Sequence, residues 1–223
     1  NIPTFNVTSR VANAILSGTG IDFETFEKEV ANDLKPKSQQ LNGKAVAFKT
    51  TVNSEIVKAR NVVGVIEGEK KDEYIVVGGH YDHLGKHDGW IWNGADDNAS
   101  GTVGVMTIAK AFKATGKKPE RSVIFAAWTG EEKGLYGSTY FVEQAKVKDL
   151  NVVLNLNYDM IARDTEGDSA KNQASMSYTK ANFNIEETTK NFIDQYDINL
   201  DLNYRPSDRP RGGSDHAPFA AED

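Results

Sequence analysis

Histidine and carboxylate side chains gather within residues 79–101 of this chain. His80 and Asp82 come directly after an apolar run, and Asp96 and Asp97 stand side by side near the other end of the stretch. Neutral imidazole and carboxylate are ligands that zinc accepts, and a ligating histidine usually needs an acceptor for its second ring nitrogen. Asp82 could be that acceptor. The stretch indicates a metal site, although a buried structural histidine and helix-capping aspartates would leave the same pattern.

Three further segments carry residues that could join such a site. Glu131 and Glu132 follow one apolar run, and Asp159 follows another. His216 lies in a loop bounded by glycine and proline. Taken singly, each could be an ordinary loop acid, a helix cap or a surface histidine. Two histidines with three or four carboxylates exceed what one tetrahedral zinc needs, so the set suggests two ions with one acid left free as a general base.

The elements that must position these residues alternate between strands and helices. Apolar runs predict strands over 46–52, 61–66, 74–79, 122–128, 152–158 and about 199–204. Helical spacing predicts helices over 9–16, 22–34, about 98–113, after 137 and about 185–196. This alternation predicts an α/β fold, a three-layer α/β/α arrangement with a mixed, mostly parallel central sheet. Ligands of such sheets bind outside the carboxyl ends of the strands, which is where the candidate residues fall.

Composition narrows the classes of function. The formal net charge of -6 and a pI near 5.3 argue against a nucleic-acid or anionic-membrane surface. The chain has no cysteine, which excludes disulfides, thiolate metal sites and cysteine nucleophiles. No run approaches the roughly 18 apolar residues of a membrane span. The first residue is asparagine rather than methionine, so we expect a processed protein that is secreted or periplasmic and has lost its leader.

Five segments, in this order, resemble the co-catalytic di-zinc exopeptidases typified by secreted bacterial leucine aminopeptidases: GGHYDHLG, NGADDNASG, AWTGEEKGLYGS, NYDMIAR and GGSDHAPF. The resemblance spans about residues 61–219 and implies the zinc-dependent exopeptidase fold, peptide substrates and two Zn²⁺ ions. It also implies a ligand set, with His80 and Asp159 on one ion, Glu132 and His216 on the other, and Asp97 bridging both. His83 and His87 are left unassigned because this set is already complete.

The resemblance implies a mechanism as well. The enzyme would be an aminopeptidase that hydrolyses the N-terminal peptide bond with a water held between the ions. Glu131 would act as general base on that water, and Asp82 would orient His80. The peptide bond between Asp96 and Asp97 would be cis.

Other functions remain open at this point. A carboxypeptidase or dipeptidase of the same superfamily would use nearly the same ligands. A glutaminyl cyclase would lack the first histidine, so His80 argues against it. A non-catalytic binding domain like the transferrin-receptor ectodomain would have lost ligands, whereas every ligand position is filled here.

The resemblance also predicts the domain organisation. Residues 1–43 would be a helical extension or the end of a preceding protease-associated domain, which would make the natural protein larger. Residues 44–223 would be the di-zinc peptidase domain. We expect this domain to be cut short at its C-terminus, because the chain ends seven residues after His216 whereas family domains continue.

Overall fold

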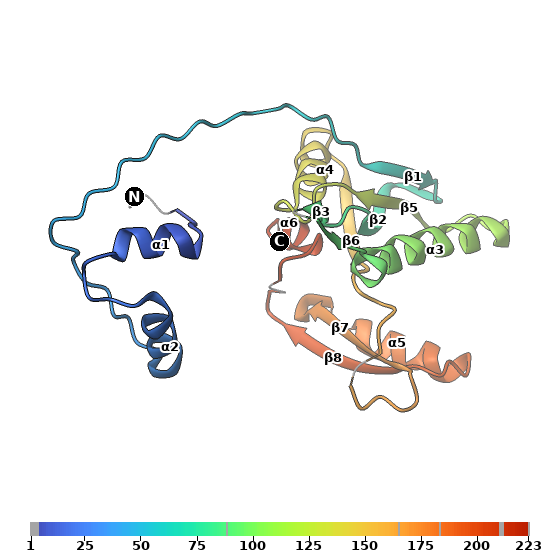
Figure 1. Ribbon diagram of the computed structural model, residues 1–223. Coiled ribbons are helices and arrows are strands. Elements are labelled where there is room, and N and C mark those ends of the chain that lie inside the picture. The colour runs from blue at the N-terminus through green and yellow to red at the C-terminus, as the bar shows by residue number, and fades with distance from the viewer. Residues whose placement is uncertain (1–4, 88, 165, 183, 210–211, 223) are drawn as a thin grey trace. The chain divides into compact units, whose positions relative to one another are not determined.

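The computed structural model describes residues 5–87, 89–164, 166–182, 184–209 and 212–222 (Figure 1). The chain divides into two compact units, residues 1–56 and 57–223. The assignment of residues 1–43 to an extension or a protease-associated domain stays a prediction, and the outermost residues, 1–4 and 223, lie outside the described ranges. Among the described residues, none of the helices combines the length and the apolar character that crossing a membrane would require.

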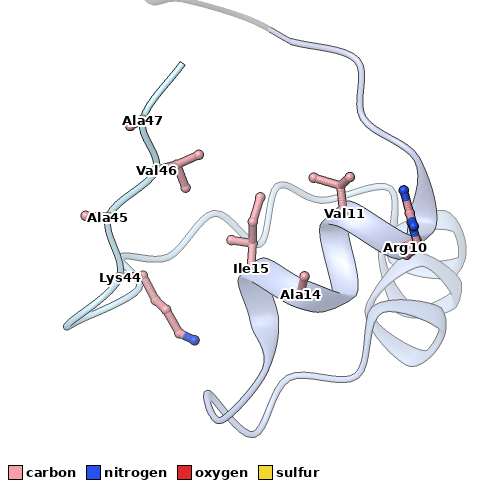
Figure 2. A pocket seen from close by; sticks show the side chains of 8 residues that line it. All are labelled: Arg10, Val11, Ala14, Ile15, Lys44, Ala45, Val46 and Ala47. Atoms are coloured by element: carbon pink, nitrogen blue, oxygen red, sulfur yellow. The ribbon is translucent and has the colours of Figure 1, made fainter. Parts of the chain in front are cut away.

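The first unit contains the two predicted helices, α1 (Ser9–Leu16) and α2 (Phe23–Asp33). Helix α2 begins after Asp22, whose carboxylate accepts a hydrogen bond from the Thr25 backbone N–H at 2.9 Å. This capping satisfies one of the free N–H groups of the first turn. A shallow pocket lies between α1 and residues 44–47 (Figure 2). Its lining has no histidine or carboxylate, so we find no metal chemistry there.

The strand predicted over 46–52 is wrong, because these residues have no regular secondary structure and are exposed. A strand needs a partner for its backbone N–H and C=O groups, and the described residues of this unit include no other strand. The apolar residues of the segment therefore lack a sheet to cover. Phe48 instead stacks on Phe5 with ring centroids 4.0 Å apart.

The second unit is built on a four-stranded sheet in the order β1-β5-β2-β6. Strand β5 pairs antiparallel with β1 and parallel with β2, and β2 pairs parallel with β6. The predicted mixed, mostly parallel sheet is thus confirmed. The strands are β1 (Val62–Ile66), β2 (Lys70–His80), β5 (Arg121–Trp128) and β6 (Asn151–Asn157).

Helices cover both faces of this sheet, as the three-layer prediction requires (Figure 1). On one face, Val105 of α3 (Gly101–Thr115) packs with buried residues of β2 and β5. On the other, Phe141 of α4 (Tyr136–Val147) and Phe219 of α6 (His216–Ala220) pack on Trp128, with ring centroids 5.0 and 6.1 Å from the indole. These two apolar layers fix the sheet whose ends carry the candidate residues.

Several elements were not predicted. A short hairpin of β3 (Gly85–His87) and β4 (Trp90–Trp92) follows β2, and a π-helical turn (Ala95–Ser100) precedes α3. Strand β7 (Gln173–Thr179) pairs parallel with β8 (Asp201–Ser207), and α5 (Asn184–Gln195) lies between them in sequence. A 3-10 turn (Lys180–Asn182) follows β7. The predicted helix over about 185–196 corresponds to α5, and the predicted final strand near 199–204 corresponds to β8.

Candidate functional site

The parallel register brings the ends of three strands to one edge of the sheet. His80, the last residue of β2, lies opposite Trp128, the last residue of β5. Gly78 of β2 lies opposite Asn157, the last residue of β6. Residues that directly follow these strands must therefore emerge close together. Glu131 and Asp159 are two such residues.

His80 is almost completely buried, at 1% exposure, and both ring nitrogens have partners. Its Nδ1 lies 3.0 Å from the backbone carbonyl oxygen of Asp82, whereas the Asp82 carboxylate is 3.9 Å away. That carboxylate instead accepts a hydrogen bond from the backbone N–H of Glu131 at 3.2 Å. Asp82 is thus next to His80 as expected, but it is the main-chain oxygen that contacts the ring, while the side chain holds the Glu131 loop.

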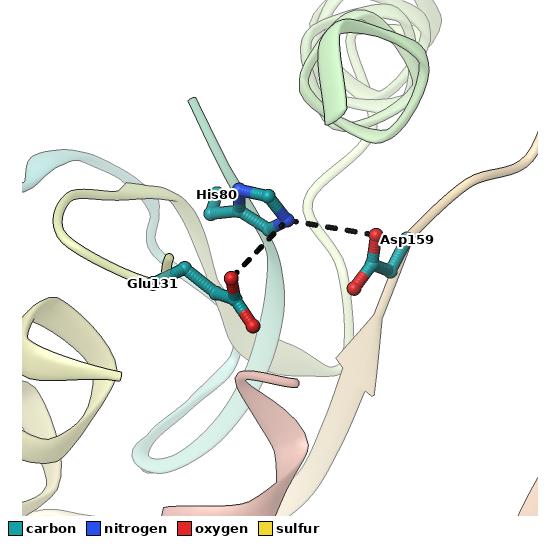
Figure 3. Close-up of side chains that lie close together, drawn as sticks. All are labelled: His80, Glu131 and Asp159. Carbon is teal, nitrogen blue, oxygen red and sulfur yellow. Dashed lines mark ion pairs between the residues drawn. The ribbon is translucent and has the colours of Figure 1, made fainter. Parts of the chain in front are cut away.

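The Nε2 atom of His80 points into a group of carboxylates (Figure 3). It lies 3.2 Å from Asp97 Oδ1, 3.5 Å from Asp159 Oδ1 and 3.9 Å from Glu131 Oε2. Burial lowers the pKa of His80, but its pairing with Asp159 and with the backbone of Asp82 outweighs burial and raises the pKa to about 9. A bound cation would take the place of that proton.

Asp159 is fixed by a hydrogen-bond relay that comes from the loop before α6. Ser214 Oγ donates to Asp159 Oδ2 at 2.6 Å, and Asn157 Nδ2 donates to Ser214 Oγ at 2.8 Å. Burial raises the pKa of Asp159, but its ionic pairing with His80 and the hydrogen bond from Ser214 outweigh burial, so the pKa lies below its ordinary value. The relay leaves Asp159 Oδ1 buried without a hydrogen-bond partner.

Asn98 ties the segment of Asp97 to the segment of Asp159. Its Nδ2 donates to the Tyr158 carbonyl at 2.9 Å, and its Oδ1 accepts from the Gly101 N–H at 2.9 Å. A side chain at Gly101 would place its Cβ 2.2 Å from the same Tyr158 oxygen, so only glycine allows this approach. Sequence reasoning missed this connecting role of Asn98. The cis peptide bond is also one residue later than expected, between Asp97 and Asn98.

The loop that carries Glu131 and Glu132 is held by its own backbone and by Asn61. The N–H groups of Gly134 and Leu135 donate to the Glu131 carbonyl at 2.9 and 3.0 Å. Asn61 accepts from the Thr129 N–H at 3.2 Å and donates to the Gly137 carbonyl at 2.8 Å, which closes the loop at both ends. This is how two adjacent acids are kept at the sheet edge.

Glu131 has the electrostatics of a proton-transfer group. Burial raises the pKa of its carboxyl, His80 lowers it, and the negative charges of Asp215 and Asp159 raise it further, so that the pKa is about 7. A group with a pKa near the working pH transfers protons efficiently. A nearby cation would favour the ionised carboxylate, which is the form that accepts a proton.

Glu132 meets a histidine that the sequence did not assign to the site. His83 Nδ1 lies 2.6 Å from Glu132 Oε1, and candidate ligand atoms of His83, Glu132 and Asp97 all lie within 4.8 Å of one another. His216, the predicted imidazole of this side, belongs to neither group of metal-ligating side chains found among the described residues. It is half-buried beside Gly212, and burial lowers its pKa, partly offset by Asp159.

The spacing of the donor atoms fits a metal ion on the His80 side. Two donors bound to one tetrahedral ion at roughly 2.0–2.2 Å lie about 3.3 Å apart. His80 Nε2 lies at 3.2 and 3.5 Å from the nearest oxygens of Asp97 and Asp159. Glu131, at 3.9 Å, is more distant. Asp159 Oδ1 is buried and has no hydrogen-bond partner, and a cation at this place would bind to it.

The charge balance points the same way. In the part of the chain that the structure describes, the ion pairs of the site carboxylates involve only His80 and His83, with no lysine or arginine. So many like charges at one edge of a sheet repel unless a cation lies among them. The carboxylates are those of Asp82, Asp97, Glu131, Glu132 and Asp159.

Comparison with known proteins identifies the family. The model of Peptidase family M28 matches residues 61–223. A glutamate carboxypeptidase 2 homolog from Caenorhabditis briggsae is 32% identical over 197 residues, which cover 80% of this chain and 25% of that protein. Among solved structures, the LapA aminopeptidase of Legionella pneumophila is 28% identical with a TM-score of 0.58, covering 73% of this chain and 42% of that one.

A zinc aminopeptidase from Bacillus subtilis is similar as well, with 25% identity and a TM-score of 0.54, covering 72% of this chain and 37% of that one. This chain spans a quarter of the nematode relative and less than half of either solved structure. The range matched by the family model includes every site residue described above and most of the chain. The chain therefore belongs to Peptidase family M28.

Proposed function

We propose that this chain carries the catalytic domain of an aminopeptidase that uses two Zn²⁺ ions to hydrolyse the first peptide bond of its substrate. One observation carries the proposal, namely that two groups of imidazole and carboxylate side chains meet at the carboxyl edge of the sheet. The similarity to solved aminopeptidases, one of them a zinc enzyme, supports it. The two groups are His80, Glu131 and Asp159, and His83, Asp97 and Glu132.

In this proposal the ligands divide between the two ions. His80 and Asp159 would hold one ion and Glu132 the other. Asp97 could serve both, because its Oδ1 is 3.2 Å from His80 while the residue also groups with Glu132. His216 remains a predicted ligand on the Glu132 side. When bound, zinc polarises the scissile carbonyl and lowers the pKa of water at the site.

Glu131 does the proton transfer. Its carboxylate takes a proton from the attacking water and returns that proton to the amine that leaves. Two features suit it to this role. Its oxygen is farther from His80 than those of Asp97 and Asp159, which leaves it free, and its backbone N–H is held by the Asp82 carboxylate.

The acidic site favours an aminopeptidase over a carboxypeptidase. A free α-ammonium group is attracted by surplus carboxylates, whereas a terminal carboxylate needs a cationic partner. Arg163, four residues after Asp159, is exposed, and the described part of the chain gives the site carboxylates no lysine or arginine as an ion-pair partner. A carboxypeptidase or dipeptidase is the alternative, and the similarity to the nematode carboxypeptidase homolog supports it.

A pair of substrates tests the proposal. The zinc-loaded chain should release the chromophore from an aminoacyl chromogenic amide and leave an N-blocked dipeptide intact. Hydrolysis of the blocked dipeptide alone would favour the carboxypeptidase alternative. Absence of both activities in a chain shown to contain zinc would favour a binding domain. The secreted or periplasmic location predicted from the sequence stays a prediction, because nothing in the fold bears on it.

A further inference from the structure

His83 lies in the loop that leaves β2, and its place there is fixed by close packing. The Tyr81 N–H donates to the Trp128 carbonyl at 2.9 Å, which ties the start of the loop to the end of β5. Gly94 lies directly under the imidazole, since a Cβ at this glycine would be 2.8 Å from His83 Cβ and Cγ and 2.9 Å from the Asp97 carbonyl oxygen. The ring is thus held between the β2 loop and the turn that carries Asp97.

The distance between the His83 imidazole and the Glu132 carboxylate indicates whether His83 pairs with Glu132 or binds the same ion. His83 Nδ1 and Glu132 Oε1 are 2.6 Å apart, and both atoms are buried. Two ligands of one tetrahedral ion would lie about 3.3 Å apart, as the donors around His80 nearly do. A separation of 2.6 Å is shorter than that and close to the range of a charge-assisted contact between imidazole and carboxylate. The contact is not aligned as a regular hydrogen bond.

We propose that His83 is a positioning residue, which pairs with one oxygen of Glu132 and so directs the other oxygen toward the metal ion. This inference rests on the proposed function, because it assigns a task within the same two-ion site. The arrangement parallels the His80 side, where Ser214 donates to Asp159 Oδ2 and leaves Oδ1 free. Glu132 and Asp159 would then each have one oxygen held by the protein and one available to the ion.

The first experiment measures the affinity of the two zinc ions separately, by chelator competition on the full 223-residue chain. Partners of ligating side chains typically contribute 10–100-fold to metal affinity. The His83→Ala variant should therefore bind one ion about 10–100-fold more weakly and the other as the parent does. His83→Gln, which keeps a donor, should recover part of the loss. His87→Ala, a change at an exposed histidine in the nearby strand β3, is the matched control and should bind both ions normally.

The second experiment separates positioning from direct ligation. The chain has no cysteine, so His83→Cys introduces its only thiol. A thiolate bound to cobalt produces a ligand-to-metal charge-transfer band in the near ultraviolet. The cobalt-loaded His83→Cys variant should lack this band, because position 83 contacts Glu132 rather than the ion. Far-UV circular dichroism of each metal-free variant checks that the fold is unchanged.

The outcomes are distinct. Unchanged affinities in His83→Ala would overturn the inference, and so would a charge-transfer band in His83→Cys, which would make position 83 a ligand. A parent chain that binds no zinc would instead refute the proposed function itself. Weaker binding of one ion, recovery by glutamine and no band together would establish His83 as the positioning partner of Glu132.

Discussion

The two sides of the site are built from different kinds of structure. On the His80 side, His80 ends β2 and Asp159 follows the parallel strand β6, and the His80 Nε2 and Asp159 Oδ1 atoms lie 3.5 Å apart, close to the spacing around a tetrahedral ion. On the Glu132 side, the residues come from loops, and a histidine that was left unassigned contacts the carboxylate at 2.6 Å. Strand ends are fixed by the register of the sheet, whereas loop residues are fixed by individual contacts.

The same difference governs what could be predicted from the sequence. All four strands of the sheet were predicted, and so were the acids after β2, β5 and β6, because the strands of such a sheet are apolar runs. Strand β7 (Gln173–Thr179) was missed although its sequence, QASMSYT, alternates Ala174, Met176 and Tyr178 with polar residues. The signal is weak because the strand has no β-branched aliphatic residue and most of it is exposed. The contact between His83 and Glu132 could not be predicted, since loops have no periodicity that places side chains. The only signal available was a histidine three residues after His80.

The strand predicted over 46–52 failed for a related reason. Its alternation is real, but a pattern of apolar residues forms a strand only where a partner supplies backbone hydrogen bonds. No described residue of the first unit offers one. An alternating apolar pattern therefore predicts a strand reliably only where the fold also supplies a partner strand.

The largest expected effect comes from Glu131→Gln, which tests the proposed proton-transfer residue. Both sides of the site depend on this residue for the reaction. Removing the proton-transfer carboxylate should lower kcat by roughly 10²–10⁴-fold, since positioned acid and base groups contribute that much. Metal content should stay as in the parent, because Glu131 is more distant from His80 than the proposed ligands. Steady-state kinetics and elemental analysis of the same preparation check both statements. A metal-loaded variant with normal kcat would remove Glu131 from the mechanism.

An intermediate effect is expected from Ser214→Ala on the His80 side. The change removes the 2.6 Å hydrogen bond that holds Asp159 Oδ2, and we expect the ion beside Asp159 to bind about 10–100-fold more weakly. The ion beside Glu132 should be unaffected. Together with His83→Ala, this variant shows whether the zinc affinity of each side of the site depends on that side's own contacts alone. If Ser214→Ala weakened both ions equally, the division into two sides would be wrong.

The smallest expected effect is that of Asn61→Ala, which loosens the loop of the Glu132 side. The change removes two hydrogen bonds, to the Thr129 N–H and the Gly137 carbonyl, and should lower the free energy of unfolding by about 1 kcal/mol. Thermal unfolding should then shift downward by roughly 2–4 °C. The exposed Asn203→Ala serves as control and should leave the transition in place. Equal shifts in the two variants would argue that Asn61 does not hold the loop.

The central claim is that two metal ions bind at the carboxyl edge of this sheet, one on each side of Asp97. Anomalous diffraction at the zinc absorption edge, from crystals of the zinc-loaded chain, tests it most directly. We predict two peaks, one between His80 and Asp159 and one beside Glu132, with Asp97 next to both. A single peak away from these residues, or none in a protein of proven zinc content, would contradict the account.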